Sequence, residues 1–193
     1  VGVIKGASNS TYAPGEAITY TVAGGVNKNN TEPITITDTL ANTYMQIKNV
    51  TVTLQRTDNY LSTETATIKL YKNDGTVEYK TVTLTASGRT FSATINLAAD
   101  FPTGSSDQIT KWELVTSDLA KDDYQFSVTT SGIVLNTDRN GVAVVDGQIL
   151  KNDVSITNNG STKTATTSPV VRVIYNQILI NGTNDPAEYA GDL

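Results

Sequence analysis

The 193-residue chain contains no cysteine and no histidine. Without cysteine it has no disulfide bond, no thiolate metal ligand and no cysteine nucleophile. Without histidine it lacks the usual general base near neutral pH and the commonest zinc ligand. Carboxylates and lysine can support catalysis by themselves, but these absences argue against an enzyme that turns over a substrate. We expect no enzyme activity of that kind, no cofactor and no metal site.

The chain also has no excess of basic residues and no long apolar run. Its formal net charge is −5, which argues against a nucleic-acid binder that relies on phosphate contacts. No apolar run approaches the roughly 20 residues of a transmembrane helix, so we expect no membrane insertion. A signal peptide and a wall-anchoring motif are both missing, as expected for a fragment of a longer chain.

Threonine, valine, isoleucine and tyrosine are frequent, and these residues favour β-strands. Apolar and polar residues alternate in many short segments that are separated by turn residues. The sequence Asn73-Asp74-Gly75 predicts a tight hairpin turn. Residues 97–101 or 117–121 could each form a helical turn at most. The expected strands are 1–7, 17–22, 33–40, 50–54, 68–70, 82–84, 91–97, 112–114, 124–128, 142–145, 149–157 and 170–180.

This pattern predicts an all-β fold, an antiparallel Ig-like β-sandwich. The strands from Thr51 to about Val115 are interpreted as an extra set inserted between a conventional beginning and end. We expect one sandwich module over residues 1–176. Residues 177–193 are expected to form the end of the final strand and a linker toward a following module.

Lys5, Asp38 and Asn152 each occupy a strand position that the alternation assigns to an apolar residue. If these registers hold, an amine, a carboxyl and a carboxamide all point toward the core. Burying a lone charge costs several kcal/mol, so each group needs a partner, and these three are chemically matched. The apolar residues on the same strand face are Val1 and Val3 for Lys5. They are Ile34, Ile36 and Leu40 for Asp38, and Leu150, Val154 and Ile156 for Asn152.

Ordinary roles remain open for all three residues. Lys5 could lie on an exposed edge strand, Asp38 could cap a turn, and Asn152 could form local hydrogen bonds near the turn at residues 146–147. Other residues of the chain could also supply the carboxamide in place of Asn152 or the acid in place of Asp38. Asn158, Asn159 and Asn176 are the alternative carboxamides, and Glu16 and Glu113 are the alternative acids.

Several motifs follow one another in an order that suggests a family. The early ones are Ile4-Lys5, Tyr12-Ala-Pro-Gly-Glu-Ala-Ile-Thr-Tyr20-Thr-Val and Ile34-Thr-Ile-Thr-Asp38-Thr-Leu. The late ones are Asp146-Gly-Gln-Ile-Leu-Lys-Asn152-Asp-Val-Ser-Ile-Thr and residues 165–173. In this order they resemble Gram-positive surface adhesin and pilin stalk modules, the collagen-adhesin-like, isopeptide-forming Ig-like domains. The resemblance covers residues 1–54 and 141–173; each motif is loose, and the order is more specific than any one of them.

The resemblance implies an intramolecular isopeptide bond between a lysine on the first strand and an asparagine near the end, assisted by an aspartate. Carried over by position, these are Lys5, Asn152 and Asp38. The chemistry suits these residue types. An amine attacks only when unprotonated, a state that an apolar core favours. A buried carboxyl retains its proton, donates to the carboxamide oxygen and shuttles protons as ammonia leaves. The reaction occurs once per molecule.

We therefore expect a structural stalk or pilus-backbone module of a bacterial cell-surface protein, extracellular and attached to the cell wall. Its partners would be neighbouring modules of the same chain. The alternative is a ligand-binding module of an adhesin that recognises a host matrix protein or glycan through residues 51–115.

Two further motifs are weaker. Asp138, Asn140 and Asp146 faintly resemble a calcium loop, but the ligand spacing and the terminal bidentate glutamate are absent, so we expect a plain turn. Trp112, Tyr124 and Phe126 could form a sugar-stacking platform. Aromatic residues on strands are usually part of the core, which is the interpretation that we favour.

Overall fold

The computed structural model describes residues 2–26, 33–56, 64–97, 109–116 and 124–174. These residues form thirteen strands, and the predicted all-β fold is confirmed. No helix in this part of the chain is long and apolar enough to span a membrane. The strands are β1 (Gly2–Ala7), β2 (Thr11–Tyr12), β3 (Ala17–Val26), β4 (Thr35–Leu40), β5 (Met45–Arg56), β6 (Glu64–Lys72), β7 (Val77–Ser87), β8 (Thr90–Asn96), β9 (Ile109–Thr116), β10 (Tyr124–Val134), β11 (Asn152–Asn158), β12 (Ser161–Thr167) and β13 (Val170–Val171).

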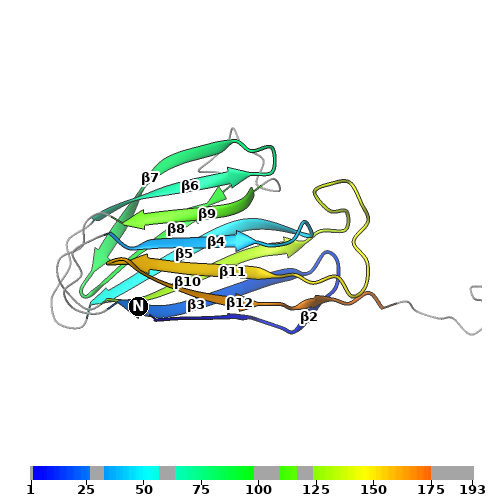
Figure 1. Ribbon diagram of the computed structural model, residues 1–193, viewed down its shortest axis with the longest axis horizontal. Helices are drawn as coiled ribbons and strands as arrows, with labels where there is room; N and C mark the ends of the chain where they lie inside the picture. The colour runs from blue at the N-terminus through cyan, green and yellow to red at the C-terminus, as the bar shows by residue number, and fades with distance from the viewer. Residues whose placement is uncertain (1, 27–32, 57–63, 98–108, 117–123, 175–193) are drawn as a thin grey trace, which may run out of the picture.

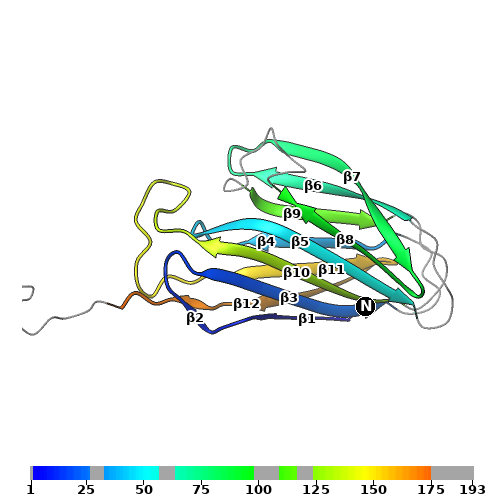
Figure 2. The same ribbon diagram turned by 180° about the vertical axis from the view of Figure 1, so that it is seen from behind.

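Eleven strands follow one another by antiparallel pairing in the order β1-β3-β10-β5-β8-β7-β6-β9-β4-β11-β12. The arrangement bends into two facing layers at β7 (Figures 1 and 2). Most of β7 pairs with β6, whereas its residues 85–87 pair with β8. The first layer therefore contains β1, β3, β10, β5 and β8. The second layer contains β6, β9, β4, β11 and β12.

The two sides of this sandwich are closed differently. On one side, β7 continues from the second layer into the first. On the other side lie the edge strands β1 and β12, which are close to each other (Figure 1) but are not joined by a β-ladder in the described residues. A short parallel pair, β2 with β13, lies at the end of the molecule where the described chain leaves it.

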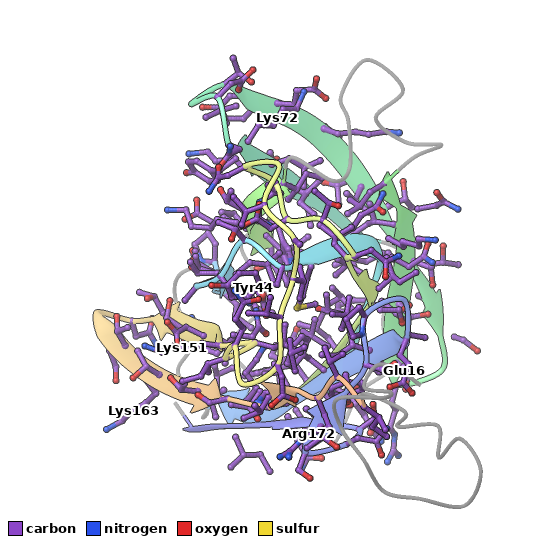
Figure 3. The ribbon with its side chains drawn as sticks, turned by 90° about the vertical axis from the view of Figure 1, so that its right-hand side faces the viewer. Glu16, Tyr44, Lys72, Lys151, Lys163 and Arg172 are labelled. Atoms are coloured by element: carbon purple, nitrogen blue, oxygen red, sulfur yellow. The ribbon has the colours of Figure 1, made fainter. Side chains whose placement is uncertain are left out.

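The core lies between the layers, and the predicted alternation places its residues correctly. Viewed end-on, the space between the layers is filled with side chains (Figure 3), and the buried ones form one hydrophobic core. The predicted hairpin at Asn73-Asp74-Gly75 is confirmed, because Lys72 N–H donates to Thr76 O and Gly75 has a φ of 85°. Fully buried residues on predicted inward faces include Ile18, Tyr20, Val22, Ile34, Ile36, Val50, Val52, Leu54, Phe91, Trp112, Leu114 and Val128.

The predicted boundary of the inserted strands falls inside β5. Thr51 lies in the middle of this strand, which pairs with β10 along almost its whole length. The strands that follow, β6 to β9, are shared between both layers, and their buried residues belong to the same core.

Three strand predictions near the end of the chain are wrong in detail. Residues 142–145 form a loop with one isolated bridge, and Val142 and Val145 are exposed. The strand predicted at 149–157 begins only at Asn152, because the preceding backbone bonds to the β13 segment instead. The strand predicted at 170–180 is limited to β13 within the described residues. The helical turns at 97–101 and 117–121 and the linker at 177–193 lie outside the described residues, apart from Leu97.

Candidate functional site

Three strands from the two layers bring Lys5, Asp38 and Asn152 together. Lys5 lies on β1, the edge strand of the first layer, while Asp38 on β4 and Asn152 at the start of β11 lie on adjacent strands of the second layer. The side chains of Lys5 and Asp38 are 0 % exposed, and Asn152 is also buried. The lysine therefore reaches across the core from one layer to the other.

The Asp38 carboxylate contacts both other groups. The Lys5 ammonium donates to Asp38 Oδ2 at 2.7 Å. Asn152 Nδ2 donates to Asp38 Oδ1 at 2.7 Å and to the backbone oxygen of Thr39 at 3.0 Å. One carboxyl group thus holds an amine on one oxygen and a carboxamide on the other.

Burial dominates the electrostatics of this carboxyl. Desolvation raises the pKa of Asp38 above its ordinary value, while the positive charge of Lys5 and the hydrogen bonds from Lys5 and Asn152 act in the opposite direction. In a low-dielectric site, a neutral amine beside a neutral carboxylic acid competes with the ion pair. Asp38 is therefore suited to accept a proton from the amine that it contacts.

Among the described residues, the Asn152 carboxamide forms hydrogen bonds through its Nδ2 group only. Its Oδ1 is buried and has no hydrogen-bond partner in the part of the chain that the structure describes. A buried acceptor without a partner costs about 1–3 kcal/mol and is uncommon in folded proteins. This oxygen is also the atom that gains negative charge when a nucleophile attacks the carboxamide carbon.

Tyr20, on β3 of the first layer, completes the surroundings of the amine. Lys5 Nζ lies 5.2 Å from the centre of its ring. The Tyr20 hydroxyl donates to the backbone oxygen of Leu150 at 2.8 Å and lies 3.1 Å from Met45 Sδ. Burial raises the pKa of this phenol, so the hydroxyl remains a donor. Sequence reasoning placed Tyr20 in the core and gave it no role, because an inward-facing aromatic residue breaks no pattern.

The ordinary roles considered for the three residues do not fit this geometry. The Lys5 side chain is fully buried although its strand is at an edge. Asp38 lies inside β4, where it is paired with Trp112 on β9 and Val154 on β11, not at a turn. The Asn152 side chain bonds to β4, not to the turn at residues 146–147.

The alternative candidates make other contacts. Asn158, at the far end of β11, donates to the backbone oxygen of Pro33, and Asn159 lies in the β11–β12 turn with a φ of 50°. Glu16 accepts from the backbone N–H of Ala13, and Glu113 forms an ion pair with Lys69. Asn176 lies outside the described residues.

The two weaker motifs have structural roles. The Asp138 carboxylate accepts from the backbone N–H groups of Asn140 and Val142 and from the Thr43 hydroxyl. These bonds lower the pKa of Asp138 and define a turn. In the described residues, no group of three or more acidic side chains is placed to hold a metal ion. Trp112, Tyr124 and Phe126 are buried in the core, so they offer no stacking surface.

Comparison with known proteins shows a similarity of fold without a close relative. No protein-family model and no curated protein sequence matches the chain. The collagen-binding domain of a Staphylococcus aureus adhesin aligns with 90% of this chain and 98% of its own, at 12% identity and a TM-score of 0.38. ACE19, the collagen-binding subdomain of the Enterococcus faecalis surface protein ACE, aligns with 89% of this chain and 95% of its own, at 13% identity and a TM-score of 0.35.

A pilus protein is also among the similar structures. The pilus backbone RrgB of Streptococcus pneumoniae aligns with 79% of this chain, at 12% identity and a TM-score of 0.38, and the match spans 27% of that protein. Adhesin domains and a pilus backbone, the classes of protein that the sequence motifs resemble, are thus among the structural neighbours. Because identities and TM-scores are this low, and a carbohydrate-binding module scores similarly, the likeness concerns the fold alone.

Proposed function

We propose that this chain is a structural module of a Gram-positive cell-surface adhesin or pilus that forms its own isopeptide bond between Lys5 and Asn152. The observation that carries the proposal is the buried Asp38 carboxyl, which contacts the amine and the carboxamide at 2.7 Å each. An amine, a carboxamide and a proton-transfer group in a closed apolar site are the components that such a reaction needs.

The reaction begins with proton transfer from the Lys5 ammonium to Asp38 Oδ2, which leaves a neutral amine and a neutral acid. Rotation about the Cβ–Cγ bonds of Asp38 and Asn152 brings the protonated Oδ2 of Asp38 to the unpartnered Oδ1 of Asn152. The Lys5 lone pair then attacks the carboxamide carbon. The electron pair of the C=O bond moves to Oδ1, and the hydrogen bond from Asp38 stabilises the developing charge.

The tetrahedral intermediate collapses by losing ammonia. Asp38 takes one proton from Lys5 Nζ and returns one to Asn152 Nδ2, so its own protonation state is unchanged over the step. The bond between the carboxamide carbon and Nδ2 breaks, and the C=O bond forms again. The product is an amide between Nζ and the side chain of Asn152. It stays in the site, so Asp38 acts once per molecule and the protein is not a turnover enzyme.

The position of this bond suits a stalk. β1 starts toward one end of the long axis, and the described chain leaves at the other end, beside β13 (Figure 1). A force applied between the ends would pass through the covalent bond and would not extend the residues between positions 5 and 152. Neighbouring modules of the same chain, in an extracellular, wall-attached protein, are the partners that this role requires.

The test is the intact mass of the purified protein beside the Lys5→Ala variant. We expect the wild type to be lighter than its sequence by about 17 Da, the mass of one ammonia, and the variant to have its full mass. Fragmentation of a peptide digest would then locate the bond at residues 5 and 152. Lys69→Ala, which removes a partly exposed lysine that pairs with Glu113, is the matched control and keeps the deficit. A wild-type mass without the deficit refutes the proposal.

A second function, ligand binding by residues 51–115, has one observation in its favour. A groove of about 460 Å³ runs between β7 and β8, where the two strands diverge. On β7, the exposed Tyr79 ring is contacted by Lys69 Nζ at 5.3 Å from its centre. A host matrix protein or glycan is the ligand class to test, by comparing binding of the wild type and Tyr79→Ala to immobilised matrix proteins and glycans. Equal retention of both proteins would exclude a role for the Tyr79 ring, which lies outside the residues that line the groove.

A further inference from the structure

We infer that Tyr20 is a positioning residue for the Lys5–Asn152 crosslink, an inference that rests on the proposed function. Its ring contacts the amine, and its hydroxyl holds the backbone that leads into the strand of the carboxamide. One side chain of the first layer therefore fixes the positions of both reacting groups.

The contacts of Tyr20 are the basis of this inference. The side chain is 0 % exposed, and Lys5 Nζ lies 5.2 Å from the ring centre. The hydroxyl donates to Leu150 O at 2.8 Å, two residues before Asn152. The N–H group of Leu150 donates to Pro169 O, so the peptide groups on both sides of Leu150 are held where β11 begins.

The reaction needs such a contact because its two partners come from different layers. Amide formation requires the amine nitrogen and the carboxamide carbon to approach within about 3–3.5 Å in the correct orientation. Asp38 contacts both groups, but it does so from the second layer, where Asn152 also lies. Tyr20 belongs to the first layer, in which it is paired with Ala7 on β1 and Thr130 on β10. Its hydroxyl bond to Leu150 therefore links the first layer to the segment that leads into β11, two residues before Asn152.

The ring and the hydroxyl have separable effects. The ring limits the space open to the long lysine side chain, which otherwise has several rotamers. The hydroxyl satisfies a buried carbonyl and holds the start of β11. Tyr20→Phe removes only the second effect, and Tyr20→Leu removes both.

Tyr12 provides a matched control for the hydroxyl. It is also buried, and its hydroxyl bonds to Ser8 Oγ and to the N–H group of Asn9, not to the reacting residues or to Leu150. Tyr12→Phe therefore removes a buried tyrosine hydroxyl of the same chain and leaves the Tyr20 contacts in place.

The experiment follows crosslinking in newly synthesised full-length chain. After a short cell-free synthesis pulse, intact mass gives the fraction that has lost about 17 Da at each time. Fluorescence of Trp112, the single tryptophan, buried beside Asp38 in the β4–β9 pair, gives the folded fraction. The rate per folded molecule separates positioning from folding, since a purely structural role lowers the folded fraction without changing that rate.

We expect Tyr20→Phe to slow crosslinking per folded molecule by roughly threefold to tenfold, the equivalent of one hydrogen bond. Tyr20→Leu is expected to be slower still, so that phenylalanine partly restores the rate, and Tyr12→Phe to stay within about twofold of the wild type. A wild-type rate in Tyr20→Phe, or an equal slowing in Tyr12→Phe, overturns the role of Tyr20. If wild type and Tyr12→Phe never lose the mass, the crosslink itself fails, and the inference fails with it.

Discussion

Replacing Asn152 with alanine removes the carbon that Lys5 would attack in the proposed reaction and should cost the fold the stability that the crosslink would provide. The bond would close a loop of about 150 residues, from position 5 to position 152. On the chain-entropy treatment used for disulfides, closing such a loop stabilises the fold by about 5 kcal/mol. In a domain of this size, 1 kcal/mol corresponds to about 2–4 °C in melting temperature. We therefore expect Asn152→Ala to lower the melting temperature by about 10–20 °C.

Differential scanning calorimetry with a matched control decides this prediction. Asn158→Ala also removes a buried asparagine from β11, whose Nδ2 donates to Pro33 O at 3.3 Å. It keeps the crosslink, so we expect it to lose only the about 1–3 kcal/mol of a buried hydrogen-bonding group. If the wild-type mass shows the bond and Asn152→Ala melts less than about 10 °C below the wild type, closing the loop does not stabilise this fold by about 5 kcal/mol.

Three further results are expected. Lys5→Met leaves Asp38 buried without a cation, and burial raises the folded-state pKa of this carboxyl. The stability that the neutral Asp38 carboxyl contributes is fully present below the unfolded pKa of about 4 and is lost as pH rises through the folded pKa. The variant should thus melt higher at pH 4 than at pH 7, and adding Asp38→Asn should flatten the profile; a melting temperature that rises with pH contradicts this. Gly132→Ala places a Cβ 2.2 Å from a backbone oxygen of β5, whereas Gly6→Ala meets nothing within 4 Å. In urea unfolding, the free energy of unfolding should fall by about 1–3 kcal/mol or more for Gly132→Ala and by about 0.5 kcal/mol or less for Gly6→Ala. Equal losses would be evidence against the close approach of the β10 and β5 backbones at Gly132. In single-molecule pulling, Lys5→Met should release about 500 Å more chain than the wild type, in which the bond to Asn152 shields the loop; equal extensions would show that the bond carries no force.

Much of the fold follows from local pattern, because a strand with one buried face alternates with period two. The same regularity exposed the candidate site. Lys5, Asp38 and Asn152 were identified because each interrupts an apolar face, and the structure places all three inside the core and in contact through Asp38. A polar residue on an inward face needs a partner, so violations of the pattern carry more information than its regular positions.

Features that depend on contacts between distant segments could not be predicted in this way. Tyr20 fits its inward position, and its contact with Leu150 joins residues 130 positions apart. Residues 142–145 are apolar enough for a strand, yet the Asp138 carboxylate holds the adjoining backbone in a turn. β12 gives no apolar signal, because it is an edge strand with mostly exposed residues. The bend of β7 between layers depends on which strands it pairs with, and local sequence does not encode that choice.

The proposed Lys5–Asn152 crosslink would lie at the side of the sandwich that backbone pairing leaves open. Backbone hydrogen bonds hold one side of the sandwich closed, because β7 pairs with strands of both layers. On the other side, six-residue β1 pairs with β3 alone, and no ladder joins it to β12 in the described strands. An edge strand with one partner is the first to separate when the chain is pulled from its end. Lys5 on β1 and Asn152 on β11, the neighbour of β12, lie across this open side, so a bond between them would join the two layers where backbone pairing does not.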